Sequence, residues 1–155
     1  MYLDHNATTP MPEPVRAAML DAMSSAWGNP HSAHARGQRA RMLVDRARGQ
    51  VAALVGRPAK DVTFTGGATE ANTWALSRCG TGDRAGVVVS AVEHPSVRAW
   101  GSRTIPVDQH GVIELDALKD CLDDTVAVVS VMAANNESGV LQPVRDVAEI
   151  CRAAG

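Results

Sequence analysis

The sequence lacks the features of a secreted, metal-binding or membrane protein. Its three cysteines, Cys79, Cys121 and Cys151, lie far apart and form no CxxC pair, which argues against a disulfide framework and against a zinc site. We interpret them as reduced residues that serve packing. No apolar run approaches the length of a membrane span, and the N-terminus lacks the basic start and apolar core of a signal peptide. We therefore expect a cytoplasmic protein that binds no metal.

The chain also lacks a strong excess of charge of either sign. Its formal net charge is -2, which gives no reason to expect nucleic acid or a membrane surface as a partner. With 155 residues, of which 45% are hydrophobic and 21% charged, it is long enough for a domain with a real core. No repeat, low-complexity tract or interdomain linker divides the sequence.

Apolar spacing predicts helices that alternate with strands. The expected helices cover residues 14–24, 32–54, 69–78, 115–122 and 144–154, with a further helix start at 95–96. The expected strands cover residues 62–65, 86–92, 104–107 and 125–132. This alternation implies βαβ units, and hence an α/β fold with a mainly parallel sheet covered by helices.

Residues 62–72 read as a strand, a tight turn and a helix start. Gly66 and Gly67 can take positive φ or let another group approach the backbone, while Thr69 can cap the helix and Glu70 suits its first turn. Exposed N–H groups at such a helix start suit a phosphate. The alternative is an ordinary turn whose glycines only relieve crowding.

Two further polar motifs follow apolar strands: Glu93-His94 and 135–137. Open parallel sheets bind ligands along the carboxyl edge, so these motifs and the glycine turn point to one crevice. The His94 ring can stack on a flat ligand or exchange protons, and Asn136 offers both a donor and an acceptor. Alternatively, His94 bonds a neighbouring backbone group and Asn136 fills a turn.

Five segments then carry a resemblance. They are Leu3–Pro10, Gly28–Ser32 with His34 and Gly37, Phe64–Asn72, Glu93–Val97, and Asn135–Val140 with Gln142 and Pro143. In this order, over essentially the whole chain, they resemble the N-terminal signature series of the cysteine desulfurases, the NifS/IscS-like group of class V aminotransferase-fold enzymes. The resemblance implies N-terminal helices followed by part of the mainly parallel sheet of a fold-type I transferase large domain. Residues 1–155 would be the N-terminal part of that domain, with no second domain in the chain.

The same resemblance implies a homodimeric enzyme that uses pyridoxal 5′-phosphate. Such an enzyme takes sulfur from L-cysteine and leaves L-alanine and a persulfide, which an iron-sulfur scaffold or another acceptor protein receives. Carried over by position, Ala68 and Thr69 would hold the cofactor phosphate. His94 would be the catalytic residue that stacks on the pyridine ring and assists proton transfer, and Asn136 would lie near the phenolic oxygen of the ring.

The N-terminal loop has two interpretations. The resemblance implies that Asn6, Ala7 and Thr8 border the active site on the substrate side, possibly within a dimer interface. Without the resemblance, the polar stretch up to Pro10 reads as an ordered loop, which serves either as a substrate-side loop or as a docked terminus.

The departures from the family concern the reacting groups. In that family, the lysine that attaches the cofactor and the aspartate that pairs with the pyridine nitrogen lie beyond the third motif, and the persulfide cysteine lies later still. The only lysines here, Lys60 and Lys119, match no family motif. We therefore expect a truncated form without turnover that self-associates. The alternatives are a selenocysteine lyase-type enzyme, a non-catalytic partner-binding module, or a phosphate-binding α/β domain unrelated to pyridoxal.

Overall fold

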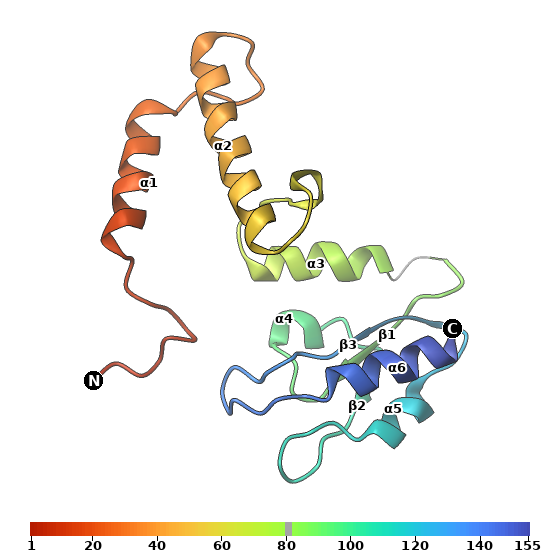
Figure 1. Ribbon diagram of the computed structural model, residues 1–155. Coiled ribbons are helices and arrows are strands. Elements are labelled where there is room, and N and C mark those ends of the chain that lie inside the picture. The colour runs from red at the N-terminus through yellow and green to blue at the C-terminus, as the bar shows by residue number, and fades with distance from the viewer. Residues whose placement is uncertain (80–81) are drawn as a thin grey trace. The chain divides into compact units, whose positions relative to one another are not determined.

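The computed structural model describes residues 1–79 and 82–155, and these form two compact units (Figure 1). We call Met1–Phe64 the N-terminal unit and Thr65–Gly155 the sheet unit. In the described part of the chain, no helix is both long enough and apolar enough to cross a membrane.

The N-terminal unit consists of helices and loops. It contains α1 (Glu13–Ser25), α2 (Ala35–Leu54) and the 3-10 helix η1 (Ala59–Asp61). The helix predicted from residue 14 begins one residue earlier, and Pro14, whose φ is fixed, lies in its first turn. The helix predicted from residue 32 begins at Ala35, because the N-cap is His34, whose Nδ1 accepts a hydrogen bond from the Gly37 N–H at 3.3 Å.

The strand predicted at 62–65 does not form. Val62 has extended dihedrals (φ -99°, ψ 122°), but the described residues pair only three strands, and this segment is not one of them. Instead, the Val62 carbonyl accepts a hydrogen bond from Arg48 Nε at 3.2 Å, and the Arg48 guanidinium lies 5.7 Å from the centre of the Phe64 ring. The extended segment is therefore held by the side chain of α2 rather than by a strand.

The sheet unit is built on a three-stranded parallel sheet of order β2-β1-β3. Its strands are β1 (Gly86–Ser90), β2 (Arg103–Ile105) and β3 (Val126–Ser130). Val89 at the centre pairs with Thr104 on one side and with Ser130 on the other. β1 ends earlier than predicted because the Glu93 N–H donates back to the Ser90 carbonyl at 3.2 Å and closes a turn. The predicted α/β class with a parallel sheet is confirmed.

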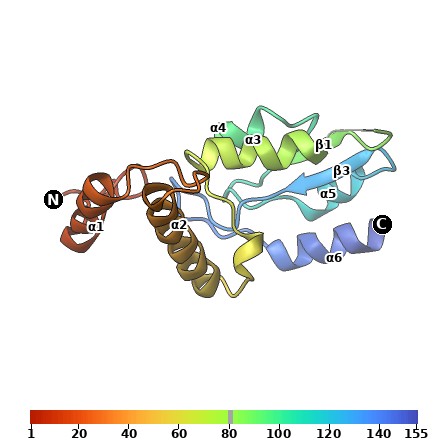
Figure 2. The same ribbon diagram turned by 90° about the horizontal axis from the view of Figure 1, so that it is seen from above.

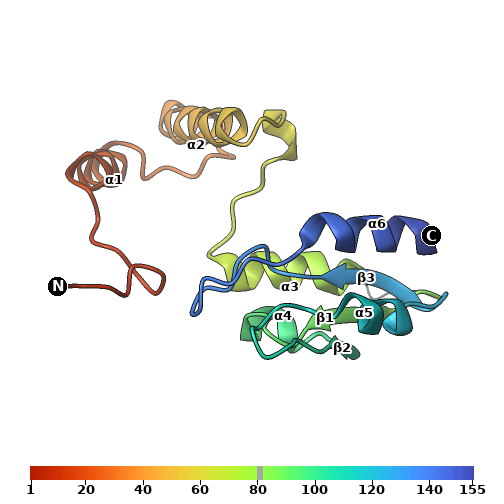
Figure 3. The same ribbon diagram turned by 60° about the horizontal axis from the view of Figure 1, so that its bottom comes forward.

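Helices cover both faces of this sheet (Figure 2). They are α3 (Ala68–Cys79) and α4 (Pro95–Arg98) on one face, with α5 (Leu115–Cys121) and α6 (Val144–Ala154) on the other. Figure 3 shows α6 returning alongside β3 after the loop that joins them. The sheet unit therefore has three layers, as expected when helices connect parallel strands.

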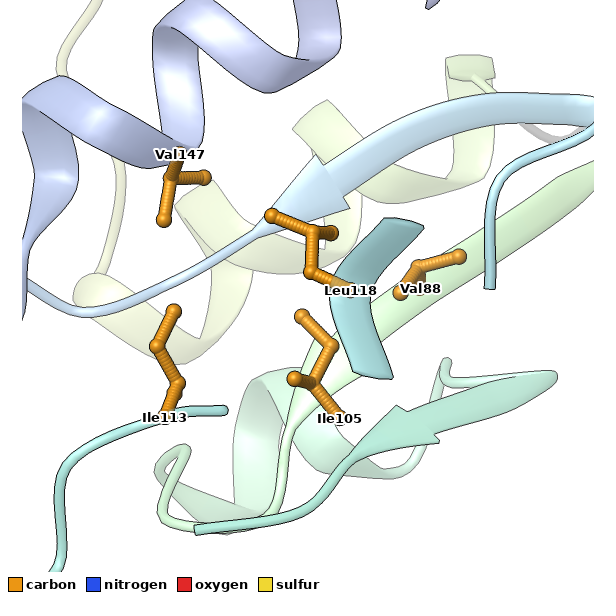
Figure 4. Close-up of a cluster of buried hydrophobic side chains, with 5 residues drawn as sticks. All are labelled: Val88, Ile105, Ile113, Leu118 and Val147. Carbon is orange, nitrogen blue, oxygen red and sulfur yellow. The ribbon is translucent and has the colours of Figure 1, made fainter. Parts of the chain in front are cut away.

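The alternation of side chains along β1 divides the core into two clusters. Val87 and Val89 pack with Leu76 of α3 and Val97 of α4. Val88 points to the opposite face, where it packs with a second group (Figure 4). That group comprises Ile105, Ile113, Leu118 and Val147. Because each fully buried aliphatic side chain contributes about 1.5–3 kcal/mol, the two clusters hold both helix layers on the sheet.

Candidate active site

The glycine turn leads into α3, and the helix begins one residue earlier than predicted. Because α3 starts at Ala68, Thr69 lies inside the first turn, and the prediction that it caps the helix is wrong. Glu70 acts at this end instead, since its carboxylate accepts a hydrogen bond from the Gly66 N–H. Neither Gly66 nor Gly67 has a positive φ. A Cβ on Gly66 would lie 3.1 Å from Glu70 Oε2, so this glycine leaves room for the bond.

The start of α3 offers backbone donors to a ligand. The first bond inside the helix runs from the Ala71 N–H to the Gly67 carbonyl at 3.1 Å. The N–H groups of Ala68, Thr69 and Glu70 therefore precede the helix's own acceptors and point out of its end. All three residues are exposed. With the positive end of the helix dipole, they form an anion-binding geometry.

His94 stands at the junction between β1 and α4. It is exposed, and it is the N-cap of α4. Its Nδ1 accepts a hydrogen bond from the Ser96 N–H at 3.2 Å and lies 2.8 Å from Ser96 Oγ. The backbone bond that the alternative interpretation of His94 expects is thus present, and it fixes the ring at the edge of the sheet. The role of His94 toward a ligand stays a prediction.

Asn72 joins this junction to α3. Its Nδ2 donates to Ser96 Oγ at 2.9 Å, across 24 residues of sequence. Asn72 lies one helical turn after Thr69, on the helix whose first turn carries the backbone donors. The glycine turn and the histidine junction are therefore neighbours, linked through one serine hydroxyl.

Glu93 joins the histidine junction to the end of β3. The residue is buried, with 7% of it exposed, and its Oε1 accepts hydrogen bonds from Ser90 Oγ and from the Met132 N–H. Asn135 adds a second link, because its Nδ2 donates to the Val92 carbonyl at 3.2 Å. The side chains of Glu93 and Asn135 thus hold the junctions after β1 and β3 together. Both residues stand in the sequence motifs, but the sequence alone does not indicate this role.

Asn135 also shapes the loop that carries Asn136. Its Oδ1 accepts hydrogen bonds from the N–H groups of Glu137 at 3.0 Å and Ser138 at 2.8 Å. The turn-forming residue is therefore Asn135, while Asn136 lies exposed inside the turn. The role of Asn136 toward a ligand stays a prediction.

Three polar junctions that lie far apart in the sequence thus meet at the carboxyl edge of one parallel sheet. A model of the family described as "Aminotransferase class-V" matches residues 1–155. The chain belongs to the class-V aminotransferase family. The resemblance derived from the sequence motifs is therefore confirmed.

The relatives of this class-V aminotransferase chain include desulfurases. It is 38% identical, over 168 residues, to the cysteine desulfurase IscS of Rickettsia bellii, covering 100% of this chain and 41% of that protein. A solved structure described as a NifS-like protein superposes with a TM-score of 0.90 at 34% identity, covering 100% of this chain and 46% of that one. The NifS-like protein from Rickettsia africae gives a TM-score of 0.84 at 32% identity, covering 99% of this chain and 45% of that one. The chain thus spans less than half the length of the relatives that it matches.

The N-terminal loop of this family member is ordered by its own contacts. Tyr2 Oη donates to the carbonyl oxygens of Asp4 at 2.8 Å and Thr8 at 3.0 Å, and the Ala7 N–H donates to Asp4 at 3.2 Å. The predicted ordered loop is confirmed. The placement of Asn6, Ala7 and Thr8 beside an active site stays a prediction.

A cavity of about 440 Å³ lies elsewhere, between β3 and α6. It is lined mainly by apolar side chains, with Arg84 and Asp123 at its polar end, and the predicted site residues are not among the described residues that line it. Cys151 also lines this cavity, and burial raises the pKa of its thiol, which agrees with a packing role. We place the candidate site at the junctions because the chemical groups converge there.

The described residues contain no group of three His, Cys, Asp or Glu side chains suited to hold a metal ion. All three cysteines are free. Lys119 lies on α5 and bonds Asp116 at 2.7 Å, and α5 leads to the beginning of β3, whereas the candidate site lies beyond the ends of the strands. Lys60 belongs to the N-terminal unit.

Proposed function

We propose that the chain forms the phosphate-binding and ring-stacking part of a pyridoxal 5′-phosphate-dependent cysteine desulfurase. The observation that carries this proposal is the hydrogen-bonded convergence of the three junctions. Ser96 bonds both Asn72 and His94, and Glu93 accepts from the Met132 N–H. A generic βα turn requires no such links between distant segments. The match to the class-V family over residues 1–155 supports the same function.

The donors at the junctions suit the two ends of this cofactor. The N–H groups of Ala68 and Thr69, together with the Thr69 hydroxyl, would hold the phosphate at the start of α3. The His94 ring, fixed through Nδ1, would lie against the pyridine, and Asn136 would reach its phenolic oxygen. When bound, the cofactor supplies an electron sink that stabilises negative charge on the substrate. The residues of this chain orient it and exchange a proton at His94.

The substrate would be L-cysteine, with L-alanine and a protein persulfide as products. This assignment follows from the desulfurases to which the chain is similar. In a longer form, we propose a cytoplasmic homodimer in which Asn6, Ala7 and Thr8 border the site. The persulfide would pass to an iron-sulfur scaffold or another acceptor protein.

Binding is tested with pyridoxine 5′-phosphate, which lacks the aldehyde and so cannot react with Lys60 or Lys119. Titration into the nitrogen-15-labelled chain should shift the amide signals of residues 66–70 and the ring signals of His94. Pyridoxine, without the phosphate, should bind at least tenfold more weakly, because charge-assisted bonds to an anion contribute about 1.5–3 kcal/mol.

Thr69→Val is the matched variant, since it removes the hydroxyl and keeps the shape of the side chain. It should weaken binding of pyridoxine 5′-phosphate and leave binding of pyridoxine unchanged. Shifts spread over the whole chain, or no shifts at the α3 start at millimolar ligand, would contradict the proposal.

Turnover is a separate question, because Lys119 lies on α5, where it bonds Asp116, and neither Lys119 nor Lys60 matches a motif of the family. Covalent chemistry at the cofactor needs an amine at the reacting carbon. The 155-residue chain with pyridoxal 5′-phosphate and L-cysteine should therefore release neither alanine nor sulfide. Release of both in equal amounts would overturn the assignment of this chain as the binding part alone.

A further inference from the structure

We propose that Ser96 and Asn72 are positioning residues that hold His94 in the tautomer with its proton on Nε2, so that the ring presents an N–H donor at the candidate site. The motifs of the family contain His94 but do not explain how its two ring nitrogens differ. The ligand in this inference rests on the proposed function, whereas the tautomer is a property of the chain alone.

The first step concerns the Nδ1 atom of His94. The Ser96 backbone N–H lies 3.2 Å from it, and a backbone N–H can only donate. Nδ1 must therefore accept, which it can do only when it carries no proton. A neutral imidazole has a single ring proton, so that proton is on Nε2.

The second step concerns the Ser96 hydroxyl, which can donate or accept. Its Oγ lies 2.8 Å from His94 Nδ1 and 2.9 Å from Asn72 Nδ2. The amide nitrogen of Asn72 is only a donor, so the hydroxyl accepts from Asn72 and its own proton is directed to Nδ1. Nδ1 then faces two donors, and Asn72 sets the direction of the second one.

The third step concerns the position of these groups. Ser96 and Asn72 are partly buried, whereas His94 and the start of α3 are exposed. The tautomer is therefore set by groups that are partly buried, and Nε2 of the exposed ring is left to bond a ligand. Proton exchange with a bound molecule is confined to Nε2, because a proton on Nδ1 would face two donors.

A second histidine in the chain has half of this arrangement. His34 is the N-cap of α2, and its Nδ1 accepts from the Gly37 N–H at 3.3 Å. The Nδ1 of His34 thus accepts from a backbone N–H three residues later, and among the described residues no serine hydroxyl acts as a second donor, as Ser96 does for His94. His34 is an internal reference for what a backbone donor alone achieves.

The test is the two-bond proton–nitrogen correlation spectrum of the histidine rings in the labelled 155-residue chain, recorded without ligand at a pH where the rings are neutral. Wild-type His94 should be in the Nε2–H form, more completely than His34. In Ser96→Ala, the ratio of Nε2–H to Nδ1–H at His94 should fall about tenfold, as expected from the loss of one hydrogen bond worth about 1.4 kcal/mol. Ser96→Thr keeps the hydroxyl and should restore the ratio.

Asn72→Asp tests the direction of the hydroxyl, since it replaces the donor by an acceptor of the same shape. The Ser96 proton should turn toward the carboxylate, and the ratio at His94 should fall while that at His34 stays constant. An Nδ1–H form in the wild type, or an unchanged ratio in folded Ser96→Ala, would overturn the inference. If Ser96→Ala does not fold, the pair Ser96→Thr and Asn72→Asp decides, and equal ratios in both would overturn it as well.

These outcomes are separate from those of the ligand titration. A chain with the predicted tautomer that ignores pyridoxine 5′-phosphate would contradict the proposed function alone. A chain that binds the ligand while His94 is in the Nδ1–H form would contradict only the role of Ser96 and Asn72.

Discussion

The two units of this chain differ in how they bury apolar side chains. The sheet unit fully buries Ile105 and Leu118 between its layers, each with 0% of the residue exposed. In the N-terminal unit, α1 has no buried residue, and Leu20 and Met23 are 60% and 68% exposed. The sheet unit therefore contains its own core, whereas α1 leaves large apolar side chains more than half exposed.

This difference implies that substitutions in the sheet unit mainly affect stability, whereas substitutions on α1 mainly affect association. Helices gain most of their stability in proteins from packing of an apolar face. Since α1 lacks such packing, its apolar side chains favour contact with another molecule, and exposed patches of this kind mark interaction sites or cause aggregation. The carboxyl-edge junctions, by contrast, belong to the unit that contains both buried aliphatic clusters.

The largest expected effect comes from the same substitution made once in each unit. Leu118→Ala removes a fully buried side chain from the cluster that joins α5 and α6 to the sheet, and it should lower the free energy of unfolding by about 2–5 kcal/mol. Leu20→Ala, at a site 60% exposed, should change it by less than about 0.5 kcal/mol. Urea denaturation followed by circular dichroism measures both. Equal losses would show that α1 has a core of its own.

A smaller effect is expected at Glu93, which fixes the two junctions to each other. Glu93→Ala leaves the Met132 N–H and the Ser90 hydroxyl without their acceptor and should cost about 1.5–3 kcal/mol. Glu93→Gln keeps one acceptor oxygen and should cost less. Glu137→Ala, in the exposed turn, is the control and should be nearly neutral. The urea titration used for Leu118→Ala also measures the free energy of unfolding of these variants. An unchanged free energy of unfolding in Glu93→Ala would contradict the proposal that Glu93 links the two junctions.

The next effect concerns association rather than unfolding. Met23→Gln keeps helix propensity and removes an exposed apolar side chain from α1, so it should raise the concentration at which the chain self-associates by about tenfold, corresponding to about 1.4 kcal/mol. Met42→Gln is the matched control, at a methionine of α2 that is 65% exposed. Sedimentation velocity over a dilution series measures both. A larger effect at Met42 would place the associating surface on α2.

The elements that sequence reasoning predicted well are those determined locally. The helix at 144–154 was predicted with the bounds of α6, because Pro143 precedes it and its apolar spacing is regular up to Gly155. Continuous apolar runs predict β1 and β3, and all three strands of the sheet end two residues earlier than predicted. The segment at 62–65 failed for the opposite reason, since a strand exists only where another strand pairs with it, and Arg48 holds this segment instead.

The site shows the same division. His94 and Asn136 were identified because they stand in motifs, but the residues that bring the motifs together were not. Ser96 meets Asn72 across 24 residues, and Glu93 meets Met132 across 39. The periodicity of apolar residues within one segment cannot predict a contact between two distant segments. The signal available in the sequence is the position of Glu93, a carboxylate three residues after the end of a strand buried on both faces.

The smallest expected effect is a dependence of the sheet unit on acid. Arg103 at the start of β2 bonds Asp123 in the loop before β3 at 2.7 Å, and it holds the pKa of that carboxyl well below its usual range, with further bonds from the hydroxyl and N–H of Thr125. A carboxyl whose pKa is lower in the folded state contributes stability above the unfolded pKa of about 3.9, and this contribution is lost as the pH falls below it. The urea midpoint should therefore decrease between pH 5 and acid values of about 3 more steeply in the wild type than in Asp123→Asn. Both partners are partly exposed, so the difference is small and should shrink further in molar salt. Parallel curves for wild type and variant would show that this pair, like the side chains of α1, adds nothing to the unit that holds the core.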